Sequence, residues 1–154
     1  MPAAQMTASD VDTAARLRAV VGRMHRRLRK TTSAATASLT PTRIAVLLHV
    51  ARTGRIRLSE LAASEGINPT MLSRVVADLT DGGLLQRVGD AGDRRAAWVK
   101  ATPAGKRLVD RMRRERTDAL YLALGELPEA DRLLVEGALP ALERLAEQLT
   151  ERAR

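Results

Sequence analysis

The chain has 154 residues, the size of one domain with helical extensions. Lys and Arg number 26 against 18 Asp and Glu, and this net charge of +8 favours a polyanionic partner, either nucleic acid or an anionic membrane surface. The absence of Cys excludes disulfides and Cys-based metal sites. The two histidines, His25 and His49, lie far apart, so we expect packing or surface roles for them, no metal site and no cofactor.

No apolar run approaches the ~20 residues needed to span a bilayer. The N-terminal segment, expected to be flexible over residues 1–8, lacks the basic and apolar parts of a signal peptide. We therefore expect a cytoplasmic protein with no membrane partner. The sequence also lacks a Gly-rich phosphate loop, a nucleophile motif and a metal-ligand cluster, so we expect no catalytic residues and no enzyme activity.

Residues 9–38 are predicted to contain a long helix, for which Ser9 and Asp10 are the N-cap candidates. Apolar residues recur in it at helical spacing and include Leu17 and Val21. Arg and Lys fill much of the rest of the helix. That charge is either a solvated face or a source of positive potential near DNA.

Residues 39–101 are predicted to form one domain that starts with a nearly apolar helix. Thr40 caps this helix, Pro41 occupies its first turn, and Gly54 ends it. Because it is apolar on almost all sides, we expect it to be the central buried helix. A very short strand is expected next, at residues 55–57.

Two further helices follow, separated by the turn Gly66-Ile67-Asn68. Ser59 is the expected cap of the first, short helix, and Asn68 is the expected cap of the second. A short helix, a turn containing Gly and a second helix form the helix-turn-helix pattern. We predict that the start and polar side of the second helix contact DNA, through Asn68, Pro69, Thr70, Ser73 and Arg74.

Residues 84–88 and 96–101 are predicted strands, and the turn-rich segment "GDAGDRR" joins them. Strand, tip and strand directly after a helix-turn-helix form a wing. Residues 39–101 are therefore predicted to form a winged helix-turn-helix DNA-binding domain. The negative potential of a narrow minor groove attracts arginine, so Arg94 and Arg95 at the tip are candidate minor-groove contacts. Asp93 is expected to organise the wing by accepting hydrogen bonds from the tip. The alternative is an ordinary solvated hairpin turn.

Residues 102–154 are predicted to form two C-terminal helices, the first capped by Thr102. The last helix, in a segment where acids outnumber arginines, carries a heptad-like apolar seam typical of a packing or dimer face. The alternative is a core within one chain. The candidate dimer-interface residues of the C-terminal helices are Leu108, Met112, Val135, Leu142, Leu145 and Leu149.

Three segments resemble the MarR (multiple antibiotic resistance regulator) family. "GDAGDRRAAWVKATPAGKRL" is similar to the family's wing signature, "LSELAASEGINPTMLSRVVADLTDGGLLQR" to its helix-turn-helix, and "LTPTRIAVLLHV" to its second helix. The resemblance implies a mainly α fold with a small β-wing: a dimeric winged helix-turn-helix of six helices and a short three-stranded antiparallel sheet.

The resemblance also implies a function and partners. The chain is expected to be a homodimeric transcription factor, by family default a repressor, that binds double-stranded DNA at a pseudopalindromic operator. The first, fifth and sixth helices form the dimer interface, with residues 9–38 and 102–154 as dimerisation segments. The fourth helix enters the major groove and the wing enters the minor groove. Many family members are released by small phenolic or anionic ligands, so a small-molecule effector is expected.

Two other functions remain alternatives. One is architectural or nonspecific DNA binding, which the positive charge alone also explains. The other is a winged-helix protein-interaction module, which predicts an uncharged recognition helix and wing. Arg74, Arg94 and Arg95 argue against that module.

Overall fold

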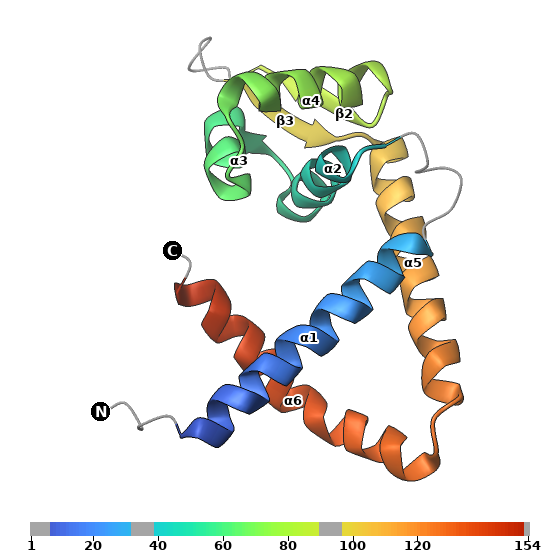
Figure 1. Ribbon diagram of the computed structural model, residues 1–154. Helices are drawn as coiled ribbons and strands as arrows, with labels where there is room; N and C mark the ends of the chain where they lie inside the picture. Colours follow the sequence, from blue (N-terminus) through green and yellow to red (C-terminus); the bar gives the residue numbers. More distant parts are fainter. Residues whose placement is uncertain (1–6, 32–38, 90–96, 153–154) are drawn as a thin grey trace. The chain divides into compact units, whose positions relative to one another are not determined.

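The computed structural model describes residues 7–31, 39–89 and 97–152 (Figure 1). Across these residues the chain forms six helices and three strands, which confirms the predicted winged helix-turn-helix architecture. The elements are α1 (Ala8–Lys30), α2 (Pro41–Thr53), β1 (Ile56–Arg57), α3 (Leu58–Glu65), α4 (Pro69–Asp81), β2 (Leu85–Val88), β3 (Trp98–Ala101), α5 (Pro103–Gly125) and α6 (Glu129–Arg152). The chain divides into two compact units, Met1–Arg116 and Thr117–Arg154.

Helix α2 is central to the core of the first unit, as its apolar sequence predicts. Val46, Leu47 and Val50 have no exposed surface, and α2 contacts α3, α4 and β3. Burying each such side chain stabilises the fold by about 1.5–3 kcal/mol. The predicted ends are also confirmed, since the Thr40 side chain accepts a hydrogen bond from the first turn and Gly54, at a positive φ of 85°, is the C-cap.

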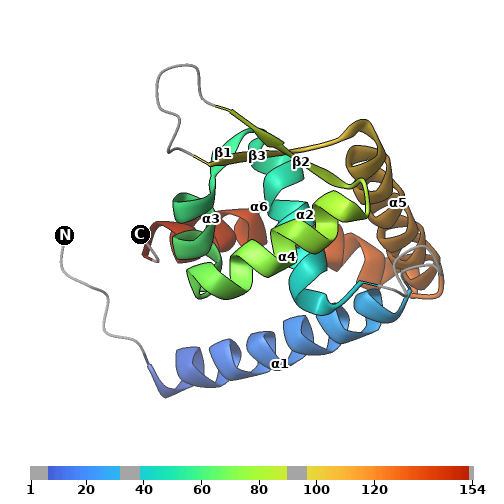
Figure 2. The same cartoon turned by 90° about the horizontal axis from the view of Figure 1, so that it is seen from above.

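The three strands form one antiparallel sheet in the order β1-β3-β2. Figure 2 shows them side by side. Ile56 pairs with Val99, and Leu85 pairs with Ala101. All four side chains are buried in the same apolar core as α2, so one face of the sheet packs on the helices. The residues that alternate with them lie on the outer face.

Helix α1 begins earlier than predicted. Its N-cap is Thr7, not Ser9 or Asp10, because Thr7 and Asp10 form a capping box. The Thr7 backbone N–H donates to the Asp10 carboxylate at 2.8 Å, and the Asp10 N–H donates to the Thr7 hydroxyl at 3.3 Å. Hydrogen bonds from the backbone and hydroxyl of Thr7 lower the pKa of the Asp10 carboxyl.

The predicted cap of α3 is also wrong. Helix α3 begins at Leu58, its N-cap is Arg57, and Ser59 lies already within the helix. The Leu58 N–H donates to the Ala97 carbonyl at 3.0 Å, just before β3. The chain therefore passes directly from β1 into α3. The Arg57 side chain makes no capping hydrogen bond, and the Ala97 carbonyl accepts the one from the first residue of the helix.

The start of α5 is held closely against the end of the loop that follows α4. As predicted, Thr102 caps α5: its hydroxyl accepts from the Gly105 N–H at 3.0 Å and donates to the Gly83 carbonyl at 2.6 Å. The Thr102 N–H donates to the Leu84 carbonyl at 3.0 Å. A Cβ placed on Gly105 would lie 2.1 Å from that carbonyl oxygen. Only glycine permits this close approach.

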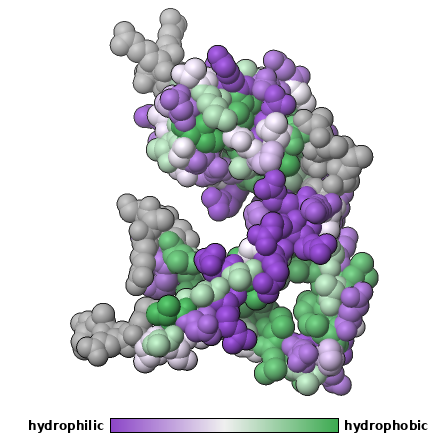
Figure 3. Space-filling view, viewed as in Figure 1, coloured by the Kyte–Doolittle hydropathy of each residue, from purple (hydrophilic) through white to green (hydrophobic). Residues whose placement is uncertain are grey.

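The second unit, residues 117–154, comprises the end of α5 and all of α6. No side chain described in it is buried. Hydrophobic side chains, green in Figure 3, gather at its surface in the lower right of the view. Its exposed large apolar residues are Tyr121, Leu122, Leu124, Leu127, Leu133, Leu134, Val135, Leu139, Leu142, Leu145 and Leu149. Among the described helices, none is long and apolar enough to cross a membrane.

Replacing Gly105 with Ala should destabilise the first unit, because the added methyl group meets the Leu84 carbonyl. We expect the free energy of unfolding in urea to fall by about 1–3 kcal/mol, the usual effect of overpacking. Gly137→Ala in α6 is the control, since a Cβ there has no atom within 4 Å. An unchanged unfolding midpoint for Gly105→Ala would contradict the close approach.

Candidate nucleic-acid interface

The recognition helix α4 is fixed at its N-terminus by local hydrogen bonds. As predicted, Asn68 caps the helix: its side-chain oxygen accepts from the Thr70 N–H at 2.9 Å, and Pro69 occupies the first turn. The preceding turn starts at Gly66, the C-cap of α3, which adopts a left-handed conformation with a φ of 61°. Two local signals thus set where α3 ends and α4 begins.

One side of α4 is buried and the other is exposed and polar. Its buried residues, Leu72, Val75, Val76 and Leu79, belong to the core. Thr70, Ser73 and Arg74 are exposed. Hydroxyl and guanidinium groups near the N-terminus of an exposed helix have the chemistry to bond base edges and phosphates.

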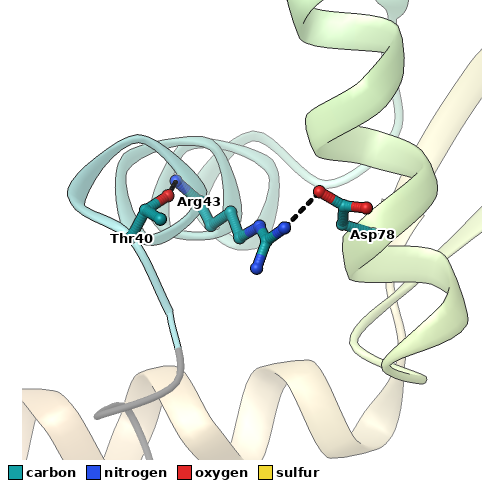
Figure 4. A network of polar contacts seen from close by, with 3 residues as sticks. All are labelled: Thr40, Arg43 and Asp78. Carbon is teal, nitrogen blue, oxygen red and sulfur yellow. Dashed lines mark hydrogen bonds and ion pairs between the residues drawn. The ribbon is translucent and has the colours of Figure 1, made fainter.

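An ion pair connects α4 to α2 (Figure 4). The Arg43 guanidinium extends from the first turn of α2, which Thr40 caps, and bonds the Asp78 carboxylate on α4. The side chains are 31% and 46% exposed, so the pair contributes at most about 1 kcal/mol to stability. This pair has no local sequence signal, because the two residues are 35 positions apart.

A second pair connects α2 to the end of α3. Nδ1 of His49 lies 2.6 Å from Oε1 of Glu65, and both side chains are mostly covered. Glu65 directly precedes Gly66, where the turn into α4 begins. The contact therefore joins the central helix to the helix-turn-helix turn, a more specific role than the packing or surface position predicted for His49.

The first unit also contains a cavity of about 670 Å³. Its lining includes the polar side chains of His25, Arg29, Glu65 and Arg116 together with apolar residues such as Leu48. The Nε atom of Arg116 is buried and, within the described part of the chain, has no hydrogen-bond partner. The cavity thus combines apolar walls with cationic groups. No sequence pattern predicts this pocket, because its lining residues come from separate segments of the chain.

Metal binding finds no support in the described residues, among which no group of three or more His, Asp or Glu side chains is placed to hold an ion.

The wing is present as β2 and β3, which are paired from Leu85–Ala101 to Val88–Trp98. Its predicted tip residues Asp93, Arg94 and Arg95 lie outside the described residues. Below the tip, the guanidinium carbons of Arg55 and Arg57 lie 4.2 and 5.0 Å from the centroid of the Trp98 ring. Sequence reasoning missed this cluster, because it depends on the pairing of β1 with β3.

The candidate dimer residues of the first unit differ in exposure. In α1, Leu17 is half-buried and Val21 is 55% exposed. In α5, Leu108 is partly buried against the core. Met112 is only 1% exposed, so its own chain already covers it. Its place in the dimer interface stays a prediction, and its burial favours the alternative, an intrachain core position.

The candidate dimer residues of α6 are all exposed. Val135, Leu142 and Leu145 are each about two-fifths exposed, and Leu149 is more so. The predicted heptad-like seam is therefore accessible along the helix.

The six helices, the three-stranded sheet and the polar side of α4 define a winged helix-turn-helix protein. The model of the MarR family matches residues 39–97. A Pseudomonas aeruginosa protein assigned as a transcriptional regulator has a similar structure, with a TM-score of 0.78 and 32% identity over 92% of this chain and 99% of that one. The chain belongs to the MarR family of DNA-binding transcriptional regulators, which are not enzymes.

Two further relatives extend over the same length. An HTH-type transcriptional regulator of Mycobacterium bovis, itself uncharacterised, is 29% identical over 93% of this chain and 99% of that one. The Multiple Antibiotic Resistance Repressor, MarR, has a TM-score of 0.67 at 20% identity, over 88% of this chain and 93% of that one. This second likeness supports the fold.

Proposed function

We propose that this chain is a homodimeric, sequence-specific transcriptional repressor that binds a pseudopalindromic operator. The observation that carries the proposal is α4: its apolar side is buried in the core, and its exposed N-terminal half presents Thr70, Ser73 and Arg74. A helix held in this way fits the major groove, where each base pair shows a distinct pattern of donors and acceptors.

In the proposed complex, Asn68 and Pro69 fix the start of α4, while Thr70, Ser73 and Arg74 contact bases and phosphates. Arg94 and Arg95 reach the minor groove from the wing tip, and Asp93 organises that tip. FabT of Streptococcus pneumoniae, whose structure was solved in complex with DNA, shares this fold with a TM-score of 0.64 at 12% identity. That complex supports DNA as a partner of this fold.

The exposed apolar side chains of α1 and α6 support dimer formation. Soluble monomers rarely expose large contiguous apolar patches, and a two-fold interface covers the same patch on both chains. A symmetric dimer would place two α4 helices in successive major grooves, about 34–36 Å apart. The proposed interface comprises Leu17, Val21, Leu108, Val135, Leu142, Leu145 and Leu149.

The cavity supports a small organic anion as effector. His25, Arg29 and Arg116 offer positive or proton-donating groups beside apolar walls. Glu65 also lines the cavity, bonds His49 and ends α3. A bound anion is therefore placed to disturb the turn into α4, and this would lower the affinity for the operator.

Arg74→Ala tests specific recognition. A guanidinium that bonds guanine supplies about 1–3 kcal/mol of discrimination, so we expect the preference for operator over unrelated duplex to fall roughly tenfold to a hundredfold. The measurement is equilibrium binding to both duplexes at one fixed salt concentration. Arg132→Ala on α6 removes the same charge at another exposed position and should leave the preference unchanged.

Three results would contradict this proposal. Equal affinity of the unaltered protein for all duplexes would indicate architectural or nonspecific binding. No binding to any duplex would favour a protein-interaction module. An unchanged preference of Arg74→Ala for the operator over unrelated duplex would contradict the role of α4 in recognising the base sequence.

Leu142→Glu tests the dimer by placing a charge in the α6 seam. We expect a monomer by sedimentation equilibrium and loss of tight operator binding, because an unpaired buried carboxylate is strongly unfavourable. The control is Leu133→Glu, nine residues earlier and thus on the opposite side of the helix at ~3.6 residues per turn. A Leu142→Glu protein that stays dimeric would place the interface elsewhere.

Benzoate, a small aromatic carboxylate, is a suitable probe of the cavity. We expect it to raise the melting temperature of the protein and to weaken operator binding, because a ligand that binds the folded state stabilises it. Arg116→Gln should reduce both effects, and Arg132→Gln should not. The same thermal shift in both variants would show that the anion binds elsewhere, and no shift at all would argue against a carboxylate effector.

A further inference from the structure

Two arginine side chains lie near the ring of Trp98, the only tryptophan in the chain, at the base of the wing. The guanidinium carbon of Arg55 lies 4.2 Å from the centroid of its ring and that of Arg57 lies 5.0 Å away. Both distances are within the ~6 Å range of a cation–π interaction. Arg57 is also the direct partner of Trp98 in the pairing of β1 with β3. These three residues are called the Trp98 stack below.

The Trp98 stack is on the outer face of the sheet. Val99 and Ala101 of β3 are buried in the core, so Trp98 and Lys100, which alternate with them, point the other way. Lys100 and Arg57 are both exposed. The sheet therefore presents positive charge on the face that is not packed against the helices.

A stacked guanidinium remains able to bind an anion. Its planar face covers the aromatic ring, whereas its N–H donors lie in its own plane and point away from that ring. Arginine bonds phosphate oxygens in this plane, often with two parallel hydrogen bonds. Stacking also restricts a side chain with many rotamers, so less conformational entropy is lost when the phosphate binds.

The position of Arg57 determines which anion it meets. Arg57 is the N-cap of α3, the first helix of the helix-turn-helix, and Leu58 bonds the carbonyl of Ala97 just before β3. In helix-turn-helix proteins the first helix crosses the DNA backbone while the second enters the major groove. On the other side, Trp98 follows Arg95 of the predicted wing tip by three residues in the sequence.

We propose that Arg57, supported by Arg55 and Trp98, binds phosphates of the DNA strand that runs between the major groove occupied by α4 and the minor groove occupied by the wing. This inference rests on the proposed DNA-binding function. The site contributes to affinity and fixes the position of the protein along the duplex. It recognises no bases, since phosphate contacts carry no direct sequence information.

Arg57→Gln tests the phosphate contact through salt dependence. Each phosphate neutralised contributes about 0.9 to the slope of log affinity against log salt, so we expect the slope to become shallower by about 1 on operator and unrelated duplexes alike. The preference for the operator should not change. Arg132→Ala is the control for loss of a positive charge and should leave the slope unchanged.

Trp98→Leu and Trp98→Phe test the role of the ring. Leucine keeps both arginines but removes the aromatic face, so we expect affinity for any duplex to fall about two- to tenfold, as the arginine side chains lose their restriction. Phenylalanine keeps a π face and should restore most of the affinity. Equal affinity of both variants with the unaltered protein would show that stacking does not support the contact.

Fluorescence of the unaltered protein gives an independent measurement, because all tryptophan emission comes from Trp98. Titration with operator duplex should change this emission in a saturable way, with the midpoint given by equilibrium binding. Emission that stays constant while the duplex is bound would overturn the proposal.

These outcomes separate the inference from the function on which it rests. If the unaltered protein binds its operator and Arg57→Gln changes neither slope nor affinity, the phosphate site is wrong and the regulator remains. If Arg57→Gln lowers the melting temperature but not the slope, the Trp98 stack is only structural and the proposal fails. If no duplex binds, the proposed function fails first.

Discussion

The packing of the first unit depends above all on the burial of α2. Val46, Leu47 and Val50 are fully covered, and the helix contacts α3, α4 and β3. The same apolar contacts therefore set the position of the recognition helix and of the strand that leads down from the wing. Because interiors are close-packed, neither element can shift without opening space in the core. A rigid core of this kind suits the proposed docking, in which two separate elements enter two grooves of one duplex.

Polar contacts add to the apolar core in setting the positions of α3 and α4. Asn68 and Gly66 define the ends of the helix-turn-helix turn, and two pairs, Arg43 with Asp78 and His49 with Glu65, connect α2 to α4 and α3. The partly exposed Arg43–Asp78 pair contributes modestly to stability. Glu65 lines the cavity and also bonds His49. The proposed effector would therefore lie beside the carboxylate that directly precedes the turn into α4.

The starts and ends of helices can be predicted from the sequence where the residues that determine them are neighbours in the chain. Thr-Pro and Asn-Pro pairs mark the starts of α2, α4 and α5, and glycines mark the ends of α2 and α3, because caps act within a few residues. The sequence does not predict contacts whose partner residue comes from a distant segment of the chain. The start of α3 depends on a bond to Ala97, and the Trp98 stack depends on strand register. An apolar stripe also does not reveal which side is already covered, as Met112 illustrates.

In the proposed complex, the core presents α4 and the wing to adjacent grooves of the DNA, and two copies of the chain do so symmetrically. A hydroxyl-radical footprint on DNA beside the protein's own gene tests this most directly. We expect two equivalent protected segments whose centres are about 10 base pairs apart, each flanked by protection across a minor groove. Uniform protection without preferred positions, or a single unpaired segment, would contradict it.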